Sequence, residues 1–317
     1  MVQDLLDTNI NKPKFLDACE AHFLKTFEKS QSKNDIDNCV LANRLRLQLI
    51  ASEITAPSKF LDHRGVMSVG GNQLKGEMNK SIPDLDYAEN ATFNIHPQLP
   101  FLLNRIGAML LLCCENIGDF GDVIEAISLQ RKGVHLTPED HPSRPDYLVN
   151  LGKSLQHRFS CTGDLTDISE AISFQQKAVD LTPEGHSNRP MNLTALGNSL
   201  LHQFSQTGEL TDISEAISLL RKAVQITPGG HPDGPKNLTL LGESLLHRFS
   251  HTGELTDISE AISFQQKAVE LTPEGHPNRP MSFASLGNSL RHQFTHTGKL
   301  RYIQGHIIPA KSHSTHS

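Results

Sequence analysis

Paired histidines are the residues of this sequence that most directly suggest chemistry. His247 and His251 are four residues apart, as are His292 and His296, and this spacing places both rings of a pair on one face of a helix. Two such pairs on neighbouring helices could bring four imidazoles together around a zinc ion. However, no His-Glu-x-x-His sequence accompanies them, and the first histidine of each pair recurs at a constant interval along the chain. We interpret these histidines as copies of one repeat position and expect no metal site.

Two other short motifs resemble reactive sites. Residues 71–76, Gly-Asn-Gln-Leu-Lys-Gly, have the outline of a phosphate-binding loop, but Glu77 follows them in place of the lysine and hydroxyl that hold phosphate and magnesium. Cys113 and Cys114 could form a nucleophilic or redox pair. Yet Cys114 occupies the position that Phe159 fills one repeat later, which favours a small buried side chain. We expect no catalytic residues, no cofactor and no small-molecule substrate.

Composition narrows the classes of partner. The chain of 317 residues has a net charge of -6, with acidic and basic residues interspersed, so it offers no basic surface for nucleic acid or an anionic membrane. Its five cysteines are odd in number, unlike a disulfide framework. The N-terminus lacks a basic start followed by an apolar run, and the apolar stretch Ile106–Cys114 is about half the length of a membrane span. We expect a cytoplasmic protein in which this stretch is a buried helix.

A repeat of 45 residues organises most of the chain. The string Asp/Glu-Leu-Thr-Asp-Ile-Ser-Glu-Ala-Ile-Ser begins at Asp164, Glu209 and Glu254, and a weaker relative begins at Asp119. A Leu-Gly or Ile-Gly pair that precedes each string keeps the same interval, from Gly107 onward. These spacings indicate four full copies and part of a fifth.

Each copy reads as two amphipathic helices. The apolar residues recur at helical rather than strand spacing in both halves of a copy. Pro145 suits a first helical turn, and Gly163 can adopt the left-handed conformation that ends a helix. We predict Thr166 as the N-cap of the second helix, with Asp167 in its first turn, and an end at Thr182 before Pro183.

Stacking of these hairpins predicts the fold. One hairpin cannot bury its apolar face alone, so neighbouring copies must cover one another. Small residues at fixed positions, such as Gly152 and Ala171, are expected to let two backbones approach closely. The sequence therefore predicts an all-α protein, a right-handed α-solenoid of helix-turn-helix repeats.

The repeat resembles the tetratricopeptide repeat (TPR). Leu151-Gly152, Ala171, Ala178 and Pro183 match its signature of Leu-Gly, two alanines and a closing proline. The longer period resembles the kinesin light chain type of this repeat. The sequence motifs LTDISEAIS and LGNSL are similar to those of a fungal family of TPR proteins. Members of that family often carry a caspase-like CHAT peptidase domain. The resemblance covers residues 97–300 and implies a TPR-like superhelix.

The two ends of the chain depart from the period. We interpret residues 1–55 as a degenerate helical region, 56–95 as a linker or irregular segment, 96–300 as the repeat array and 301–317 as a flexible tail. The last copy loses the repeated string after Leu300, which leaves its first helix without the usual second helix.

The resemblance implies that the first helices of the repeats line a concave groove for extended or helical partner segments. The paired-lysine clamp that chaperone-binding relatives use for a C-terminal carboxylate is not reproduced in this sequence. Carried over by repeat position, the groove candidates are Asn150, Lys153, His157, Thr194, Asn198, Leu201, His202, Thr239, Glu243, Leu246, His247, Asn288, Arg291 and His292.

Two functions follow from these observations. The first is a non-enzymatic scaffold that binds protein or peptide partners in the groove, without nucleic acid or membrane. The alternative is a regulatory or sensor segment of a larger CHAT-peptidase or NLR-like signalling protein, truncated here. The resemblance to the CHAT-linked fungal family implies this alternative. A solvated face with no fixed ligand is the competing interpretation of the groove residues.

Overall fold

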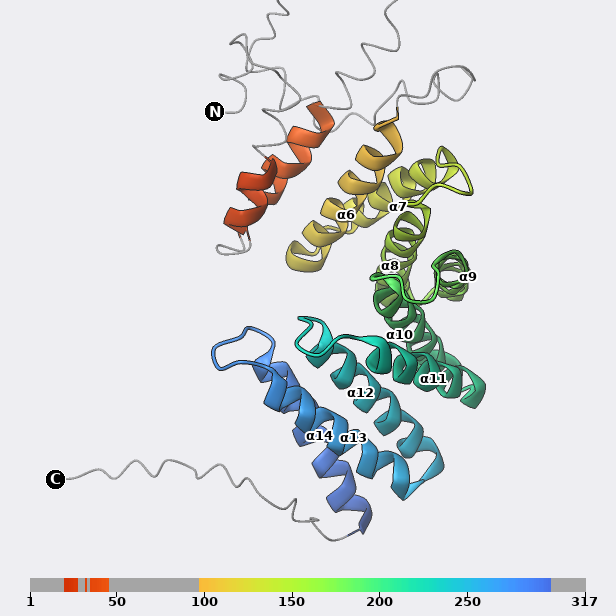
Figure 1. Cartoon of the computed structure of the whole chain (residues 1–317), viewed down its shortest axis with the longest axis vertical. Helices are drawn as coiled ribbons and strands as arrows, with labels where there is room; N and C mark the ends of the chain where they lie inside the picture. Colours follow the sequence, from red (N-terminus) through yellow and green to blue (C-terminus); the bar gives the residue numbers. More distant parts are fainter. Residues whose placement is uncertain (1–19, 28–31, 33–34, 46–96, 298–317) are drawn as a thin grey trace, which may run out of the picture. The chain divides into compact units, whose positions relative to one another are not determined.

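Every regular element that the structure describes is a helix. The computed structural model describes residues 20–27, 32, 35–45 and 97–297, and residues 20–27 and 35–45 are helical. The helices that follow are α6 (Leu99–Ile117), α7 (Phe120–His135), α8 (Arg144–Thr162), α9 (Leu165–Leu181), α10 (Arg189–Thr207), α11 (Leu210–Ile226), α12 (Gly234–Thr252), α13 (Leu255–Leu271) and α14 (Arg279–Thr297) (Figure 1).

The helices pair in chain order, as the period predicts. α6 packs on α7, α8 on α9, α10 on α11 and α12 on α13, and α14 packs against α13. The chain forms two compact units that divide between Pro183 and Glu184. The first contains α6–α9 with the two N-terminal helical segments, and the second contains α10–α14. The prediction of an all-helical repeat of hairpins is confirmed.

Proline and glycine set the limits of the first helices, as predicted. In α8, Pro145 lies in the first turn, and Gly163 ends the helix with φ of 72°. The Gly163 N–H donates to the Phe159 carbonyl at 2.7 Å, a bond that a residue with a Cβ makes only at the cost of backbone strain. The same arrangement recurs in α10 and α12, so the turn between the two helices of each hairpin is encoded by the repeat.

The predicted N-cap of the second helix is wrong by two residues. α9 begins at Leu165, and its N-cap is Asp164, whose Oδ1 accepts from the Thr166 backbone N–H at 2.9 Å and from the Thr166 hydroxyl at 2.8 Å. An ionised carboxylate satisfies an amide at a helix N-terminus more strongly than a threonine hydroxyl does. Thr166 therefore lies inside the helix, and Asp167, although in the first turn as predicted, is buried and accepts from the partly exposed Arg158.

The two helices of a hairpin meet at a glycine. A Cβ added to Gly152 would lie 2.7 Å from Cγ of Gln175, so no larger residue fits there without displacing that side chain. The expected close approach of two backbones at Gly152 is therefore an approach of one backbone to a buried glutamine. A Cβ added to Gly242 would likewise lie against the Gln265 side chain, whereas a Cβ added to Gly197 would lie against the Leu220 side chain.

Each unit has its own apolar core. In the first unit, Phe23, Phe27 and Ile36 of the N-terminal helices cluster with residues of α6 and α7. In the second unit, the core joins α10 to α13, with Phe204 and Phe249 among its members. Ala171 and Leu196, which the stacking model requires to be buried, are 0% and 1% exposed.

Helix α6 is the most apolar helix of the described residues. The window Leu99–Asn116 is long and apolar enough to cross a membrane by length and composition, but 61% of it is buried inside the protein. Ile106, Leu110 and Cys113 belong to the core of the first unit. Packing therefore accounts for the apolar character of Ile106–Cys114, as the sequence predicts.

The histidines of the connectors accept backbone hydrogen bonds just before the first helices. His141 is exposed, and its Nδ1 accepts from the Ser143 backbone N–H at 3.1 Å, directly before α8. His186, His231 and His276 accept from the residue two positions later in the same way. Because Nδ1 is the acceptor, the proton of the neutral ring lies on Nε2. The Nε2–H donor therefore faces away from the turn.

Three predicted segments lie outside the described residues. They are most of the degenerate N-terminal region, the segment 56–95 with its phosphate-loop-like sequence, and the tail 301–317.

Candidate partner-binding surfaces

The first helices of consecutive repeats lie side by side within each unit. α6 contacts α8 in the first unit, and α12 contacts both α10 and α14 in the second. This arrangement brings equivalent positions of successive repeats together. The predicted groove residues lie on these helices: Asn150, Lys153 and His157 on α8; Thr194, Asn198, Leu201 and His202 on α10; Thr239, Glu243, Leu246 and His247 on α12; Asn288, Arg291 and His292 on α14.

Side-chain hydrogen bonds connect the first helices of the second unit. The Thr194 hydroxyl on α10 donates to Oδ1 of Asn237 on α12 at 3.2 Å. The Ser285 hydroxyl on α14 donates to Oε1 of Glu243 on α12 at 2.6 Å. In the first unit, Asn150 on α8 donates to Oδ1 of Asn104 on α6 at 3.3 Å. Thr194, Glu243 and Asn150 are therefore each hydrogen-bonded to a residue of the neighbouring first helix.

Burial divides the predicted groove residues into two classes. Leu201, Thr239 and Leu246 are only 7%, 4% and 6% exposed, and both leucines belong to the apolar core of the second unit. They support the helices and offer little surface to a partner. The remaining positions of that unit are at least partly exposed, and we call them the first-helix row: Thr194, Asn198, His202, Glu243, His247, Asn288, Arg291 and His292.

His247 lies at the centre of the row. Its pKa is lowered, chiefly by desolvation of the ring even though the residue as a whole remains exposed, while the carboxylate of Glu243 opposes the shift. The rings of His202, His251 and His292 contribute further lowering of the pKa through like charge. His247 on α12 therefore lies close enough to the equivalent histidines of α10 and α14 for their charge to lower its pKa.

The second histidine of each pair packs against a phenylalanine. His251 meets the Phe204 ring edge to face, with ring centroids 4.7 Å apart, and His296 meets Phe249 at 5.2 Å. Nδ1 of His251 also lies 3.0 Å from the His247 carbonyl oxygen. Among the described residues, no group of three or more His, Cys, Asp or Glu side chains is placed to hold a metal ion.

One cysteine and one histidine come together in the first unit, a contact that the sequence analysis missed. Sγ of Cys114 on α6 lies 3.4 Å from Nε2 of His157 on α8. Cys114 is only 4% exposed, and burial raises the pKa of its thiol, with further raising by Cys161 and Asp122. A raised thiol pKa disfavours the thiolate that a nucleophile requires, so the contact fits packing between two helices.

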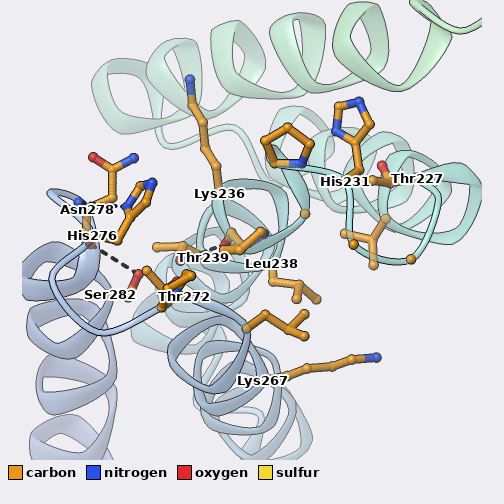
Figure 2. Close-up of a pocket in the computed structure, with 18 of the residues that line it drawn as sticks. Thr227, His231, Lys236, Leu238, Thr239, Lys267, Thr272, His276, Asn278 and Ser282 are labelled. Atoms are coloured by element: carbon orange, nitrogen blue, oxygen red, sulfur yellow. Dashed lines mark hydrogen bonds between the residues drawn. The ribbon is translucent and has the colours of Figure 1, made fainter. Parts of the chain in front are cut away.

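A pocket of about 460 Å³ lies in the second unit (Figure 2). It is lined by the end of α11, the connector between α11 and α12, the first turns of α12, the end of α13, the connector between α13 and α14, and the start of α14. Lys236, Lys267, His231 and His276 contribute its charged and titratable side chains, and no acidic residue is among the described residues that line it. Leu238, at its apolar interior, is 4% exposed.

The pocket exists because this copy lacks an arginine. At the equivalent position of other copies, Arg144 donates to the Thr137 carbonyl and, at 3.0 Å, to the Val134 carbonyl, and Arg279 donates to the Thr272 carbonyl. The third copy has Gly234 there, and a Cβ added to Gly234 would meet nothing within 4 Å. The space that an arginine side chain fills elsewhere is therefore open beside Thr227.

The same copy also lacks a glutamate. Lys177 pairs with Glu139 at 3.5 Å, and Lys222 pairs with Glu184 at 3.2 Å. The equivalent lysine at the pocket is Lys267, but Gly229 occupies the glutamate position. Lys267 makes no ion pair or hydrogen bond within the part of the chain that the structure describes.

Sequence reasoning could have found the pocket from these two departures. The connector reads His-Pro-Ser-Arg, His-Ser-Asn-Arg and His-Pro-Asn-Arg in three copies but His-Pro-Asp-Gly at 231–234. The pocket arises where one copy differs from the others, whereas the period is read from the residues that the copies share.

Comparisons with known proteins give structural likenesses alone. No family model matches the chain, and no curated protein matches it. A Podosopora anserina structure described as a kinesin light chain with nearly identical TPR-like repeats is 19% identical over 63% of this chain and 88% of that chain, with a TM-score of 0.45. A single-substitution variant of that protein is 18% identical over 64% and 90%, with a TM-score of 0.47.

A de novo designed helical repeat protein is 12% identical and covers 87% of this chain and 97% of its own, with a TM-score of 0.22. At these identities and TM-scores, the fold assignment depends on the helices of this chain itself, and no partner or activity is transferred from these structures. The resemblance to the CHAT-linked fungal family stays a prediction from the sequence.

Proposed function

We propose that this chain is a non-enzymatic scaffold that binds protein or peptide partners along the first-helix row. The observation that carries the proposal is the side-by-side arrangement of α10, α12 and α14, which presents one polar surface built from equivalent residues of three repeats. A partner segment that lies across these helices contacts the same repeat position several times. Repeated weak contacts on a rigid surface are the means by which helical repeat proteins bind extended partners.

The row has the chemistry of a recognition surface. Glu243, His247 and Arg291 offer a carboxylate, an imidazole and a guanidinium, and Asn198 and Asn288 offer amides. Such groups fix the register of a bound segment through hydrogen bonds, while the buried leucines beneath hold the helices in place. The regulatory role in a larger CHAT-linked protein stays an alternative, because it depends only on the sequence resemblance to the CHAT-linked fungal family.

Affinity capture from the source cell tests this proposal. The full chain carries an affinity tag, and bound proteins are quantified by mass spectrometry. The row variant combines Asn198→Ala, His247→Ala and Arg291→Ala, which remove exposed or partly exposed groups without opening the core. The matched control combines Ser218→Ala, Gln225→Ala and Ser263→Ala, three exposed positions on the second helices α11 and α13.

We expect the row variant to lose proteins that the wild type and the control variant both retain. Equal capture by all three chains would contradict binding at the row. Capture of no protein above the tag-only background by the wild-type chain would contradict the scaffold function itself.

A further inference from the structure

We propose that the pocket between α12, α13 and α14 binds an acidic segment of a partner protein, in which carboxylates flank an apolar side chain. The inference rests on the proposed scaffold function, because a bound partner is the source of the segment. It concerns a site beside the first-helix row, in the connector region of the third copy.

The charges of the pocket favour a carboxylate. Lys236 and Lys267 line it, and neither makes an ion pair or hydrogen bond within the residues that the structure describes. Figure 2 shows the two ammonium groups reaching out from different margins of the pocket. Two separated cations on a chain of net charge -6 match a segment with more than one carboxylate better than a single small anion.

The histidines and threonines around the pocket have assigned hydrogen-bond roles. Nδ1 of His231 and Nδ1 of His276 each accept a backbone N–H, so the neutral rings carry their protons on Nε2. The hydroxyls of Thr239 and Thr272 already donate to backbone carbonyls of their own helices. The charged and titratable side chains left for a ligand are ammonium and imidazole N–H donors, which suit carboxylate oxygens. Acceptors are also present: Asn278 contributes an amide, and the Asp233 carboxylate lies 3.8 Å from Nδ1 of His231. The backbone carbonyls of Val224 and Thr227 correspond to those that accept from Arg144 in its copy.

The other copies show how a carboxylate engages this lysine position. Glu139 pairs with Lys177 and Glu184 pairs with Lys222, each from the connector of the preceding repeat. In the third copy, Gly229 removes that internal carboxylate and leaves Lys267 open. A carboxylate from a partner can occupy the place of the missing glutamate.

The space left open at Gly234 can hold the apolar side chain of the segment. Gly234 leaves unfilled the volume that Arg144 and Arg279 fill in their copies. The pocket has Leu238, Val224 and Met281 among its lining residues. An aliphatic side chain between two carboxylates can enter this space while its neighbours reach the lysines.

Fluorescence anisotropy with a defined probe tests the inference. The probe is a fluorescein-labelled peptide with two glutamates on each side of one leucine, and its control has glutamine in place of every glutamate. The full chain is titrated into each peptide at low ionic strength. Gly229→Glu restores the internal carboxylate, Gly234→Arg refills the space, and a double variant combines Lys236→Met with Lys267→Ala. A Cβ at either glycine meets no atom within 4 Å, so both glycine variants are expected to fold.

We expect the wild-type chain to bind the glutamate peptide and not the glutamine peptide. The double lysine variant should weaken binding at least about fivefold, the size expected for the loss of two exposed charge pairs. Gly229→Glu should weaken binding by pairing with Lys267 and repelling the peptide carboxylates, and Gly234→Arg, which also adds a positive charge, should weaken it less, by filling the space for the leucine side chain. Lys222→Ala is the matched control, because Lys222 already pairs with Glu184, and it should leave binding unchanged.

Equal binding of both peptides, or binding that no pocket variant weakens, would overturn the inference. Binding of inorganic phosphate that Gly229→Glu abolishes, without any binding of the peptide, would also overturn it. The scaffold proposal is judged separately: loss of captured partners in the row variant supports the scaffold even if the pocket variants retain every partner.

Discussion

Arg158 and Asp167 join the two helices of one hairpin by a bidentate ion pair. Nε of Arg158 donates to Oδ2 of Asp167 at 2.8 Å, and Nη2 donates to Oδ1 at 2.5 Å. Asp167 is only 2% exposed, and its carboxylate raises the pKa of the Arg158 guanidinium. Arg248 and Asp257 repeat the pair with two bonds of 2.7 Å.

Removal of the arginine should destabilise the first unit. Arg158→Ala leaves the buried Asp167 carboxylate without its partner, and we expect the free energy of unfolding to fall by about 3 kcal/mol. The measurement is urea denaturation of the wild-type and variant chains, followed by circular dichroism.

The α10–α11 hairpin supplies the matched control for this substitution. There, Gln203 donates to Asp212 at 2.9 Å in place of an arginine. Arg158→Gln should therefore retain one hydrogen bond and cost about 1 kcal/mol. Equal destabilisation by the alanine and glutamine variants would show that the carboxylate does not depend on a hydrogen-bond donor.

The buried glutamine of the hairpin should be replaceable by leucine with a gain in stability. Gln175 is 0% exposed, and neither its amide nitrogen nor its amide oxygen has a hydrogen-bond partner within the described residues. Leu220 occupies the same position of the next copy and packs against Gly197. We expect Gln175→Leu to raise the free energy of unfolding by about 1–2 kcal/mol, measured by urea denaturation. A loss of stability would indicate that the amide is solvated by an internal water.

Leu196→Ala should be strongly destabilising. Leu196 is 1% exposed, so the substitution leaves a cavity that costs about 2–5 kcal/mol. Thermal denaturation of the variant tests this expectation, with Gln206→Ala at an exposed position of the same helix as the control. A variant as stable as the wild type would contradict the packing described for α10.

His247 should titrate below the usual histidine pKa of about 6.5. Its pKa is lowered by desolvation and by neighbouring histidines, whereas Glu243 raises it. Glu243→Gln should therefore lower the pKa of His247 further. Two-dimensional NMR of the imidazole protons across pH 5–8 (about the range that brackets this pKa) measures both values. A His247 pKa above the usual value in the wild type would show that Glu243 outweighs desolvation and the neighbouring histidines, which would contradict this account.

The sign of the pH effect on stability follows from this shift. Because the folded-state pKa of His247 is depressed, the unfolded state binds more protons as the pH falls through that window. The contribution of His247 to stability is therefore complete above the unfolded-state pKa and is lost as the pH falls through the folded-state pKa. His247→Ala should reduce the loss of stability on acidification, measured by urea denaturation at several pH values.

Features that every copy shares were predictable from the sequence. The interval of 45 residues predicted the positions of the helical hairpins. Gly163 predicted a helix end, because only glycine enters the left-handed region without strain. Burial of Ala171 followed from its place on the apolar face. These predictions succeeded because periodic spacing and glycine conformation are local properties of the chain.

Features that depend on contacts between distant residues were not predictable in the same way. The N-cap of α9 is a local matter instead: the ionised carboxylate of Asp164 accepts the backbone N–H of Thr166 two residues later. Leu246 was predicted to be in the groove but lies in the core, since neighbouring helices cover it. The pocket depends on two glycines in one copy, whose effect appears only when the missing side chains of Gly229 and Gly234 are compared with their counterparts.

Amide hydrogen exchange of the chain, with and without a captured partner, tests the central claim most directly. Binding along the first-helix row predicts slower exchange in α10, α12 and α14, whose row residues would contact the partner, with little change in α11 and α13. Protection confined to α11 and α13, with exchange in α10, α12 and α14 unchanged, would contradict the account.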